Sequence, residues 1–228
     1  DQTRRQRQMC IRDRDKTGAY ANLAYSIDGI NWFSVSDHQY NTFNGVAHNS
    51  LRPHTITFPG SLMVAVGQGN NTIAHSDNGE DWYPVHNNTD IFSDAGHGVA
   101  WNGTIWVVVG QGNYHTIAYS NDAITWTGLN KHIFTSRGNG VAWNGTRWVA
   151  VGQGTNTTIA YSDDGISWIS VSNTNIFSTA GHGVAWNGTR WVAVGQGSYT
   201  IVYSEDGITW TGATDANGNN IFSNAGYG

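Results

Sequence analysis

Short runs in which apolar and polar residues alternate recur along most of the chain. Within residues 140–171, "GVAWN" places Val141 and Trp143 on one face and Ala142 on the other, and "RWVAVG" alternates in the same way. "TIAYS" and "ISWISV" follow as two further runs of this type. A period of two residues is typical of β-strands, and the 3.6-residue period of an amphipathic helix does not appear. The pattern therefore predicts four short strands.

The segments between these runs carry turn residues. "NG" at Asn144 and Gly145 is a strong hairpin signal, and it predicts a type I′ turn in which both residues have positive φ. "DDG" at 163–165 predicts a second tight turn, and "QGTNT" at 153–157 predicts a glycine-rich loop. The four strands are therefore expected to form one antiparallel sheet, with its strands in chain order.

The whole pattern repeats along the chain. Residues 140–154 and 183–197 are identical, and the first glycines of the "VGQG" strings, Gly67, Gly110, Gly152 and Gly195, are 43, 42 and 43 residues apart. Tandem units of four strands in about 42 residues are typical of β-propeller blades. The sequence thus predicts an all-β fold, a β-propeller with blades that start near residues 45, 98, 140 and 183. A β-sandwich with coincidental repeats is the alternative.

The two ends of the chain affect the expected number of blades. Residues 17–44 contain only the last two strands of a blade, and the string "SNAGYG" ends the chain where a further "VAWNG" would begin. We therefore expect about 4.5 blades, with the propeller incomplete at both ends. Residues 1–16 hold the only cysteine, Cys10, and include "MCIRDR", which resembles a translated sequencing adapter. We interpret them as an artefact or a disordered segment outside the fold.

Charge and composition exclude several classes of function. Residues 17–228 carry five basic against thirteen acidic residues, a formal charge of −8. That balance argues against nucleic-acid binding, which requires clustered Lys and Arg. No apolar run is long enough to cross a bilayer, so membrane insertion is not expected. With Cys10 set aside, neither disulfides nor a thiolate metal site is available, and we expect no cofactor and no metal.

A second motif occurs at the predicted turn before each fourth strand. It reads "SIDGINW", "SDNGEDW", "SNDAITW", "SDDGISW" and "SEDGITW". The motif resembles the Asp-box (BNR) repeat of sialidase-like propellers, although it is one residue shorter, and Asn78 and Ala123 replace the acid and the glycine once each. We expect a structural turn in which an Asp such as Asp164 accepts backbone N–H bonds, Gly165 takes positive φ, and Trp168 covers the turn. The expected turn residues are Asp28, Asp122, Asp164, Asp206, Trp32, Trp82, Trp126, Trp168 and Trp210.

The same resemblance raises the question of catalysis. A sialidase-like hydrolase would imply three arginines that bind a carboxylate, a tyrosine nucleophile and paired acidic groups. Arg147 and Arg190 occupy the same blade position beside a hairpin, and the only glutamates, Glu80 and Glu205, lie inside the Asp-box turns. No pair of carboxylates suited to general acid–base chemistry is apparent. The sequence leaves enzyme activity uncertain and favours a protein without such activity. If the chain is an enzyme, a glycoside hydrolase is the expected class.

Polar loops at the opposite end of the predicted blades suggest binding instead. They are rich in Gln, Asn, His, Ser and Tyr and poor in charge, which suits hydrogen bonding and stacking on neutral sugars. The candidate ligand-binding residues are Gln68, Gln111, Gln153, Gln196, His97, Asn139, His182 and Tyr227. In the alternative interpretation these side chains are structural, and they form hydrogen bonds to backbone groups of the loops or cap a strand.

The sequence therefore favours a non-catalytic, multivalent recognition or adhesion module whose partners are glycans or a protein surface. The alternatives are a fragment of a sialidase-like hydrolase and a structural or protein-docking propeller. The cellular location stays open, with an extracellular or particle surface among the options. The strand tryptophans are expected to fill the core between blades. They are Trp101, Trp106, Trp143, Trp148, Trp186 and Trp191.

Overall fold

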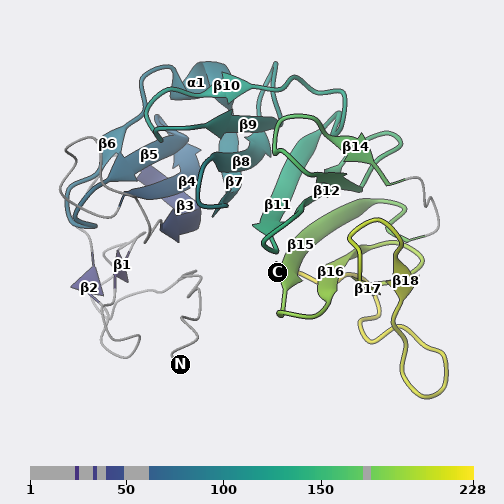
Figure 1. The fold of residues 1–228 in the computed structure, drawn as a ribbon. Coiled ribbons are helices and arrows are strands. Elements are labelled where there is room, and N and C mark those ends of the chain that lie inside the picture. The colour runs from purple at the N-terminus through teal and green to yellow at the C-terminus, as the bar shows by residue number, and fades with distance from the viewer. Residues whose placement is uncertain (1–23, 26–32, 35–39, 49–61, 172–175) are drawn as a thin grey trace.

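A computed structural model describes residues 24–25, 33–34, 40–48, 62–171 and 176–228. These residues form eighteen strands and one short helix, so the all-β prediction is confirmed. The sheets follow one another along an arc around an open centre (Figure 1). Within each four-stranded sheet the strands pair antiparallel in chain order, with the first strand nearest the centre of the arc and the fourth on the outside.

Four such sheets repeat along the chain. The first contains β3 (Tyr40–His48), β4 (Met63–Gly69), β5 (Ile73–Ser76) and β6 (Tyr83–Pro84). The second contains β7 (Ala95–Trp101), β8 (Trp106–Gln111), β9 (Ile117–Ser120) and β10 (Thr127–Gly128). The third contains β11 (Arg137–Trp143), β12 (Trp148–Gln153), β13 (Ile159–Ser162) and β14 (Ile169–Ser170). The fourth contains β15 (Ala180–Trp186), β16 (Trp191–Gln196), β17 (Ile201–Ser204) and β18 (Thr211–Gly212).

Two smaller features complete the described chain. β1 (Ala24–Tyr25) and β2 (Phe33–Ser34) pair as a separate two-stranded antiparallel sheet. The helix α1 (Asn88–Ile91) lies between the first and second sheets and was not expected. The first two sheets also share one bridge between Gln68 of β4 and Ala95 of β7. Residues 1–16, Asp28 and Trp32 lie outside the described residues.

The first strands begin earlier than the sequence indicated. β7, β11 and β15 start at Ala95, Arg137 and Ala180, not near residues 98, 140 and 183. Glycines weaken strand propensity, which is why the alternating pattern does not extend the predicted strands into "AGHG". The structure uses these glycines for close contact between sheets, because a Cβ on Gly98 would lie 3.3 Å from the Gly140 Cα, and one on Gly140 would lie 3.5 Å from the Gly183 Cα.

The fourth strands, in contrast, are shorter than expected. β14 contains only Ile169 and Ser170 of the predicted "ISWISV". Trp168 belongs to the preceding turn, where its indole Nε1–H donates to the Gly165 carbonyl.

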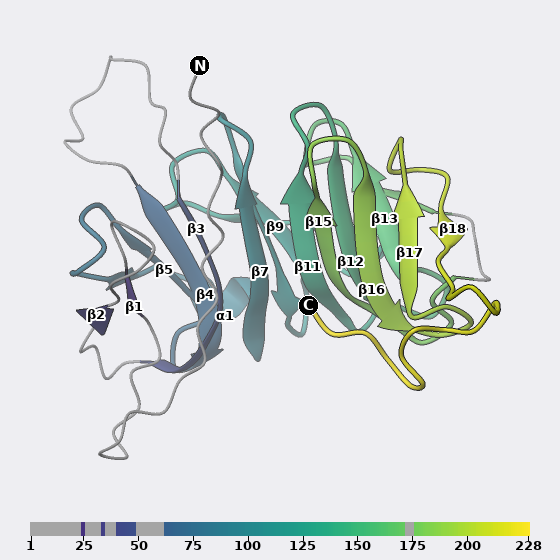
Figure 2. The same cartoon turned by 90° about the horizontal axis from the view of Figure 1, so that it is seen from below.

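The apolar core lies between consecutive sheets. Val107 and Val109 of β8 pack with Trp148 and Ala150 of β12 in one cluster, together with Phe134 from the loop that enters β11. The third and fourth sheets are stacked face to face in the same way (Figure 2). Trp106, Trp148 and Trp191 are completely buried, and Trp101 is buried as well. Trp143 and Trp186 are part-exposed and pack beside them, so the prediction of a tryptophan-rich core is confirmed with these two at its margin.

Candidate functional site

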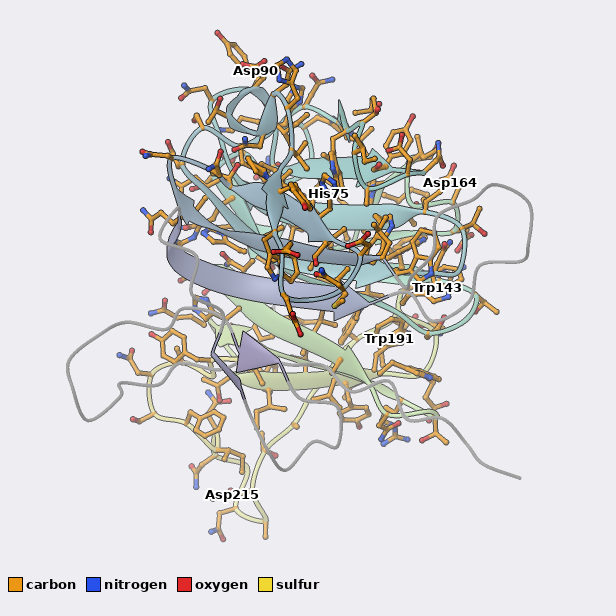
Figure 3. All side chains as sticks on the ribbon, turned by 90° about the vertical axis from the view of Figure 1, so that its left-hand side faces the viewer. His75, Asp90, Trp143, Asp164, Trp191 and Asp215 are labelled. Carbon is orange, nitrogen blue, oxygen red and sulfur yellow. The ribbon has the colours of Figure 1, made fainter. Side chains whose placement is uncertain are left out.

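The strand register separates the two ends of every sheet. At one end Ala95 pairs with Gln111, and at the other end Trp106 pairs with both Trp101 and Ser120. We call the first end the glutamine edge. It comprises Gln68, Gln111, Gln153 and Gln196 with the loops 69–72, 112–116, 154–158 and 197–200. We call the second end the box edge, which comprises the turns 76–82, 120–126, 162–168 and 204–210. Asp164, Trp143 and Trp191 lie toward the box edge in Figure 3, and Asp90 and Asp215 lie toward the other.

The described turns at the box edge are hairpins closed by side-chain hydrogen bonds. The Asp164 carboxylate accepts hydrogen bonds from the N–H groups of Ile166 (2.7 Å) and Ser167 (2.6 Å) and from the Ser162 hydroxyl (2.9 Å). Gly165 has φ of +77° and Trp168 covers the turn. The Ser162 and Asp164 side chains thus bond to each other within the hairpin, whereas the Asp163 carboxylate pairs with Arg147 outside it.

The other described boxes repeat this arrangement. Asp122 and Asp206 accept the equivalent bonds, and Asn78 does so with its side-chain oxygen at 2.9 Å from the N–H groups of both Glu80 and Asp81. Ala123 adopts φ of +63° in place of a glycine. In each described box, the tryptophan indole Nε1–H donates at 3.1 Å to the backbone carbonyl of the residue at the glycine position. The tryptophans are Trp82, Trp126, Trp168 and Trp210.

Hydrogen bonding shifts the acidity of these carboxyl groups. Partial burial of Asp164 opposes ionisation, but the bonds from Ser167, Ile166 and Ser162 outweigh it and lower the pKa to about 2. The same balance lowers the pKa of Asp206 to about 2, and it lowers the pKa of Asp122. The carboxylates are therefore held ionised by their own turns and are poorly suited to act as general acids near neutral pH.

The "NG" hairpins at the box edge differ from the predicted type I′ turn. Gly103, Gly145 and Gly188 have positive φ, but the preceding asparagines do not. Asn144 uses its side-chain oxygen instead, which accepts from the N–H groups of Thr146 (2.9 Å) and Arg147 (2.7 Å). The asparagine stabilises the turn as a hydrogen-bond acceptor rather than through a left-handed backbone.

Both hairpin arginines are also occupied at the box edge. Arg147 Nε lies 2.7 Å from Asp163 Oδ1, and its Nη1 donates to the Asp206 carbonyl of the next sheet at 2.8 Å. Arg190 Nη2 lies 2.8 Å from Glu205 Oε1. Their guanidinium groups lie over the rings of Tyr161 and Tyr203. These cations are therefore committed to contacts within the fold.

The glutamines occupy equivalent positions at the end of each second strand, within the strand rather than in the loop where the sequence placed them. Their backbones are paired, since the carbonyls of Gln111, Gln153 and Gln196 accept the N–H groups of Asp94, Ser136 and Thr179. Among the residues that the structure describes, none of their four side-chain amides forms a hydrogen bond. Gln68 is exposed and the other three are part-exposed. The edge thus presents a row of unpaired amides to solvent.

The variable position next to this row serves mainly as a contact between sheets. His97 Nδ1 lies 2.9 Å from the Gly138 carbonyl, and Asn139 Nδ2 donates to the Gly181 carbonyl at 2.7 Å, each reaching the following first strand. His182 stacks on Tyr227 with ring centroids 4.8 Å apart. The sequence placed these residues in loops, whereas His97, Asn139 and His182 lie within first strands. Only Tyr227 is strongly exposed, at 77%.

Arg137 is also at this edge, as the register partner of Gln153 and the first residue of β11. Its Nε is buried without a hydrogen bond, and so is Nε2 of His182. Burial lowers the pKa of His97 and His182, and the positive charge of Arg137 lowers both further. Both imidazoles are therefore favoured in the neutral form.

Sequence reasoning missed a set of contacts that join neighbouring sheets at the glutamine edge. The hydroxyl of Thr116, before β9, donates to the carbonyl of Phe134, before β11, at 2.9 Å. Thr158 and Phe177 repeat the contact at 2.9 Å, and Thr72 and Phe92 repeat it at 3.1 Å. The recurring strings "TI" and "IF" were the available signal. These contacts hold the loops beneath the glutamines in place.

Other classes of site find no support in the described part of the chain. No group of three or more His, Cys, Asp or Glu side chains there has an arrangement able to hold a metal ion. No helix in those ranges has the length and hydropathy of a membrane span.

Comparisons with known proteins give a likeness of fold only. No protein-family model and no curated protein matches the chain. A chain in the crystal structure of a nidogen/laminin complex is similar with a TM-score of 0.55 and 9% identity, over 80% of this chain and 68% of that one. The computationally designed Ika8 protein gives a TM-score of 0.46 and 15% identity, over 76% of this chain and 48% of that one. The first likeness agrees with antiparallel sheets in a curved array.

Proposed function

We propose that this chain is a β-propeller-type recognition module that binds neutral polar ligands, carbohydrates in particular, at its glutamine edge and without catalysis. The observation that carries the proposal is the row of glutamine amides with no hydrogen-bond partner among the described residues. A primary amide offers two donors and one acceptor oxygen, which matches the hydroxyl groups of a sugar. The equivalent groups at the box edge are satisfied within their own turns.

Repetition adds a further property to this proposal. The glutamines recur at the same position of successive sheets, so a ligand with repeated units could contact several of them at once. Binding to two sites in this way raises the apparent affinity without any new type of contact. The proposed ligand is therefore an oligosaccharide or a glycan-coated surface rather than a single sugar.

A glycan array with the whole chain tests this proposal. For each neutral oligosaccharide that binds, calorimetry should show that Gln153→Ala weakens the affinity about 3- to 10-fold, the effect of one neutral hydrogen bond. The double variant Gln153→Ala, Gln196→Ala should weaken it further. Thr146→Ala, a polar truncation at the box edge, is the matched control and should leave the affinity unchanged.

Two results would reject the proposal. One is the absence of binding to any neutral glycan, and the other is an unchanged affinity in the double variant. The thermal unfolding midpoint of each glutamine variant should stay close to that of the parent chain, because an exposed side chain without partners contributes little to stability. A large fall would instead assign these glutamines to the fold.

A further inference from the structure

Arg137 is the only charged residue at the position that lies opposite a glutamine in each described sheet, where the other first strands have Thr42, Ala95 and Ala180. The equivalent first strands β7 and β15 begin with Ala95 and Ala180, which are 5% and 2% exposed. Two residues later, Asn139 stands where those strands have His97 and His182. The third sheet thus has an arginine and an asparagine where the second and fourth sheets have an alanine and a histidine, at the edge with the unpaired glutamines.

The guanidinium of Arg137 has no counter-charge in the described part of the chain. Arg147 and Arg190 each pair with a carboxylate at 2.7 and 2.8 Å, but Arg137 forms no ion pair or hydrogen bond there. Its Nε is buried and unsatisfied. An arginine stays protonated in proteins, and a buried donor without a partner costs free energy, more so when it is charged. A residue of this kind is explained most directly by a ligand that supplies the missing acceptor.

Neighbouring groups complete the site. Gln153, directly opposite Arg137 in the register, has a free side-chain amide, and Nε2 of His182 is buried without a partner. The charge of Arg137 acts on both His97 and His182, which places the two rings within electrostatic reach of the guanidinium. His97 Nδ1 is engaged by the Gly138 carbonyl. A cation, an amide and an imidazole nitrogen with no partner thus belong to one end of the third and fourth sheets.

We propose that Arg137, assisted by Gln153 and His182, binds an oxyanion, so that this part of the glutamine edge selects ligands that carry a carboxylate or a sulfate group. The planar guanidinium donates two parallel hydrogen bonds to such a group, a geometry that lysine lacks. This inference builds on the proposed carbohydrate function and narrows it: one sheet recognises an acidic substituent, and the equivalent positions of its neighbours recognise neutral parts of the same chain of sugars.

Calorimetric titration of the whole chain tests the site with three probes. They are trigalacturonate, its fully methyl-esterified form, and a sulfated heparin-derived tetrasaccharide. Arg137→Ala should weaken binding of the charged probes about 10-fold or more, since a hydrogen bond to a charged group is worth about 1.5–3 kcal/mol. It should leave the affinity for the methyl ester unchanged. Loss for one charged probe alone identifies carboxylate or sulfate as the preferred group, and supports the site either way.

Two controls separate this site from charge and folding effects. Arg190→Ala removes the same unit charge at the box edge and should not change binding of the charged probes. Arg137→Ala installs the residue that β7 and β15 carry, so its thermal midpoint should be unchanged or higher. Arg137→Lys keeps the charge without the planar fork, and it should recover only part of the affinity.

The outcomes distinguish this inference from the function on which it builds. Equal affinities of the parent chain and Arg137→Ala for both charged probes, or no binding of either probe, overturn the oxyanion site. Binding of neutral oligosaccharides with no preference for the acid over its ester overturns it alone and leaves the glutamine edge as a neutral site. Binding of the charged probes through Arg137 without any neutral glycan binding upholds the oxyanion site and rejects the neutral one.

Discussion

The two edges of the sheets use similar polar side chains in opposite ways. At the box edge, the Asp164 carboxylate, the Asn144 side-chain oxygen and the Arg147 guanidinium all have partners within 2.9 Å. At the glutamine edge, the Gln153 amide and the Arg137 guanidinium have none among the described residues. Both edges repeat along the chain, so repetition alone does not distinguish structure from function. The difference lies in whether the hydrogen-bonding capacity is used within the fold.

The largest expected effect comes from removing a box tryptophan. Trp168 is 8% exposed, belongs to the core between the second and third sheets, and donates to the Gly165 carbonyl. Trp168→Ala should lower the free energy of unfolding by about 3–5 kcal/mol, because it leaves a cavity and an exposed turn. Urea denaturation followed by tryptophan fluorescence or circular dichroism measures the change.

Gln153→Ala is the comparison at the other edge and should change the free energy of unfolding by less than about 0.5 kcal/mol. The distinction between the two edges fails if both substitutions destabilise the protein to a similar extent. The distinction becomes sharper if Gln153→Ala leaves the free energy of unfolding unchanged but weakens ligand binding. Gln153 would then contribute to binding and not to stability.

An intermediate effect is expected where neighbouring sheets join beneath the glutamines. Thr116 is completely buried, and its hydroxyl donates to the carbonyl of Phe134 in the loop that enters the next sheet. Thr116→Val keeps the shape of the side chain and removes the bond, which should cost about 1–3 kcal/mol of unfolding free energy. Thr146→Val is the control, since the Thr146 hydroxyl bonds to Asn144 at an exposed hairpin and should contribute little. Equal effects of the two variants would show that the joint is not a determinant of stability.

Much of the box edge could be predicted from the sequence because its interactions are local. The bonds of Asp164 to Ile166 and Ser167, and the positive φ of Gly165, depend on residues within one turn. The alternating pattern similarly predicted strands in chain order, since hairpins pair neighbours. Even here, the "NG" turns were assigned the wrong type, because the side chain of Asn144 accepts bonds that a type I′ backbone would have made unnecessary.

The glutamine edge was harder to predict because it is built from contacts between sheets. The bond between Thr116 and Phe134 joins residues whose closeness depends on how two sheets stack, which periodicity within one sheet does not reveal. The same holds for His97 and Asn139, two candidates for ligand contact whose side chains reach carbonyls of the following first strand. Arg137 was not among the predicted site residues, because only the strand register places it opposite Gln153.

The smallest expected effect concerns the charge of a box carboxylate. The pKa of Asp164 is lowered from 3.8 to about 2 in the folded chain, so the folded state favours the ionised form more than the unfolded state does. Its contribution to stability is therefore complete above about pH 4 and is lost as the pH falls toward 2. Asp164→Asn should keep the turn, because Asn78 accepts the equivalent bonds in its own box, but it removes the ionisable group.

Thermal midpoints measured from pH 7 to pH 2.5 separate the charge of Asp164 from its geometry. The parent chain should be the more stable at pH 7, and its advantage over Asp164→Asn should shrink as the pH falls through the range between the two pKa values. If the thermal midpoints of the parent chain and of Asp164→Asn change with pH in parallel, the charge of the Asp164 carboxylate contributes nothing to stability. Gln68→Glu adds a carboxyl group at the opposite edge, where no backbone turn receives it and where its register partners Thr42 and Ala95 carry no charge. The thermal midpoint of this glutamate variant should therefore depend little on the new carboxyl group between pH 7 and pH 2.5. That result would show that the two edges differ in the hydrogen-bond partners of their side chains rather than in the chemistry of the side chains themselves.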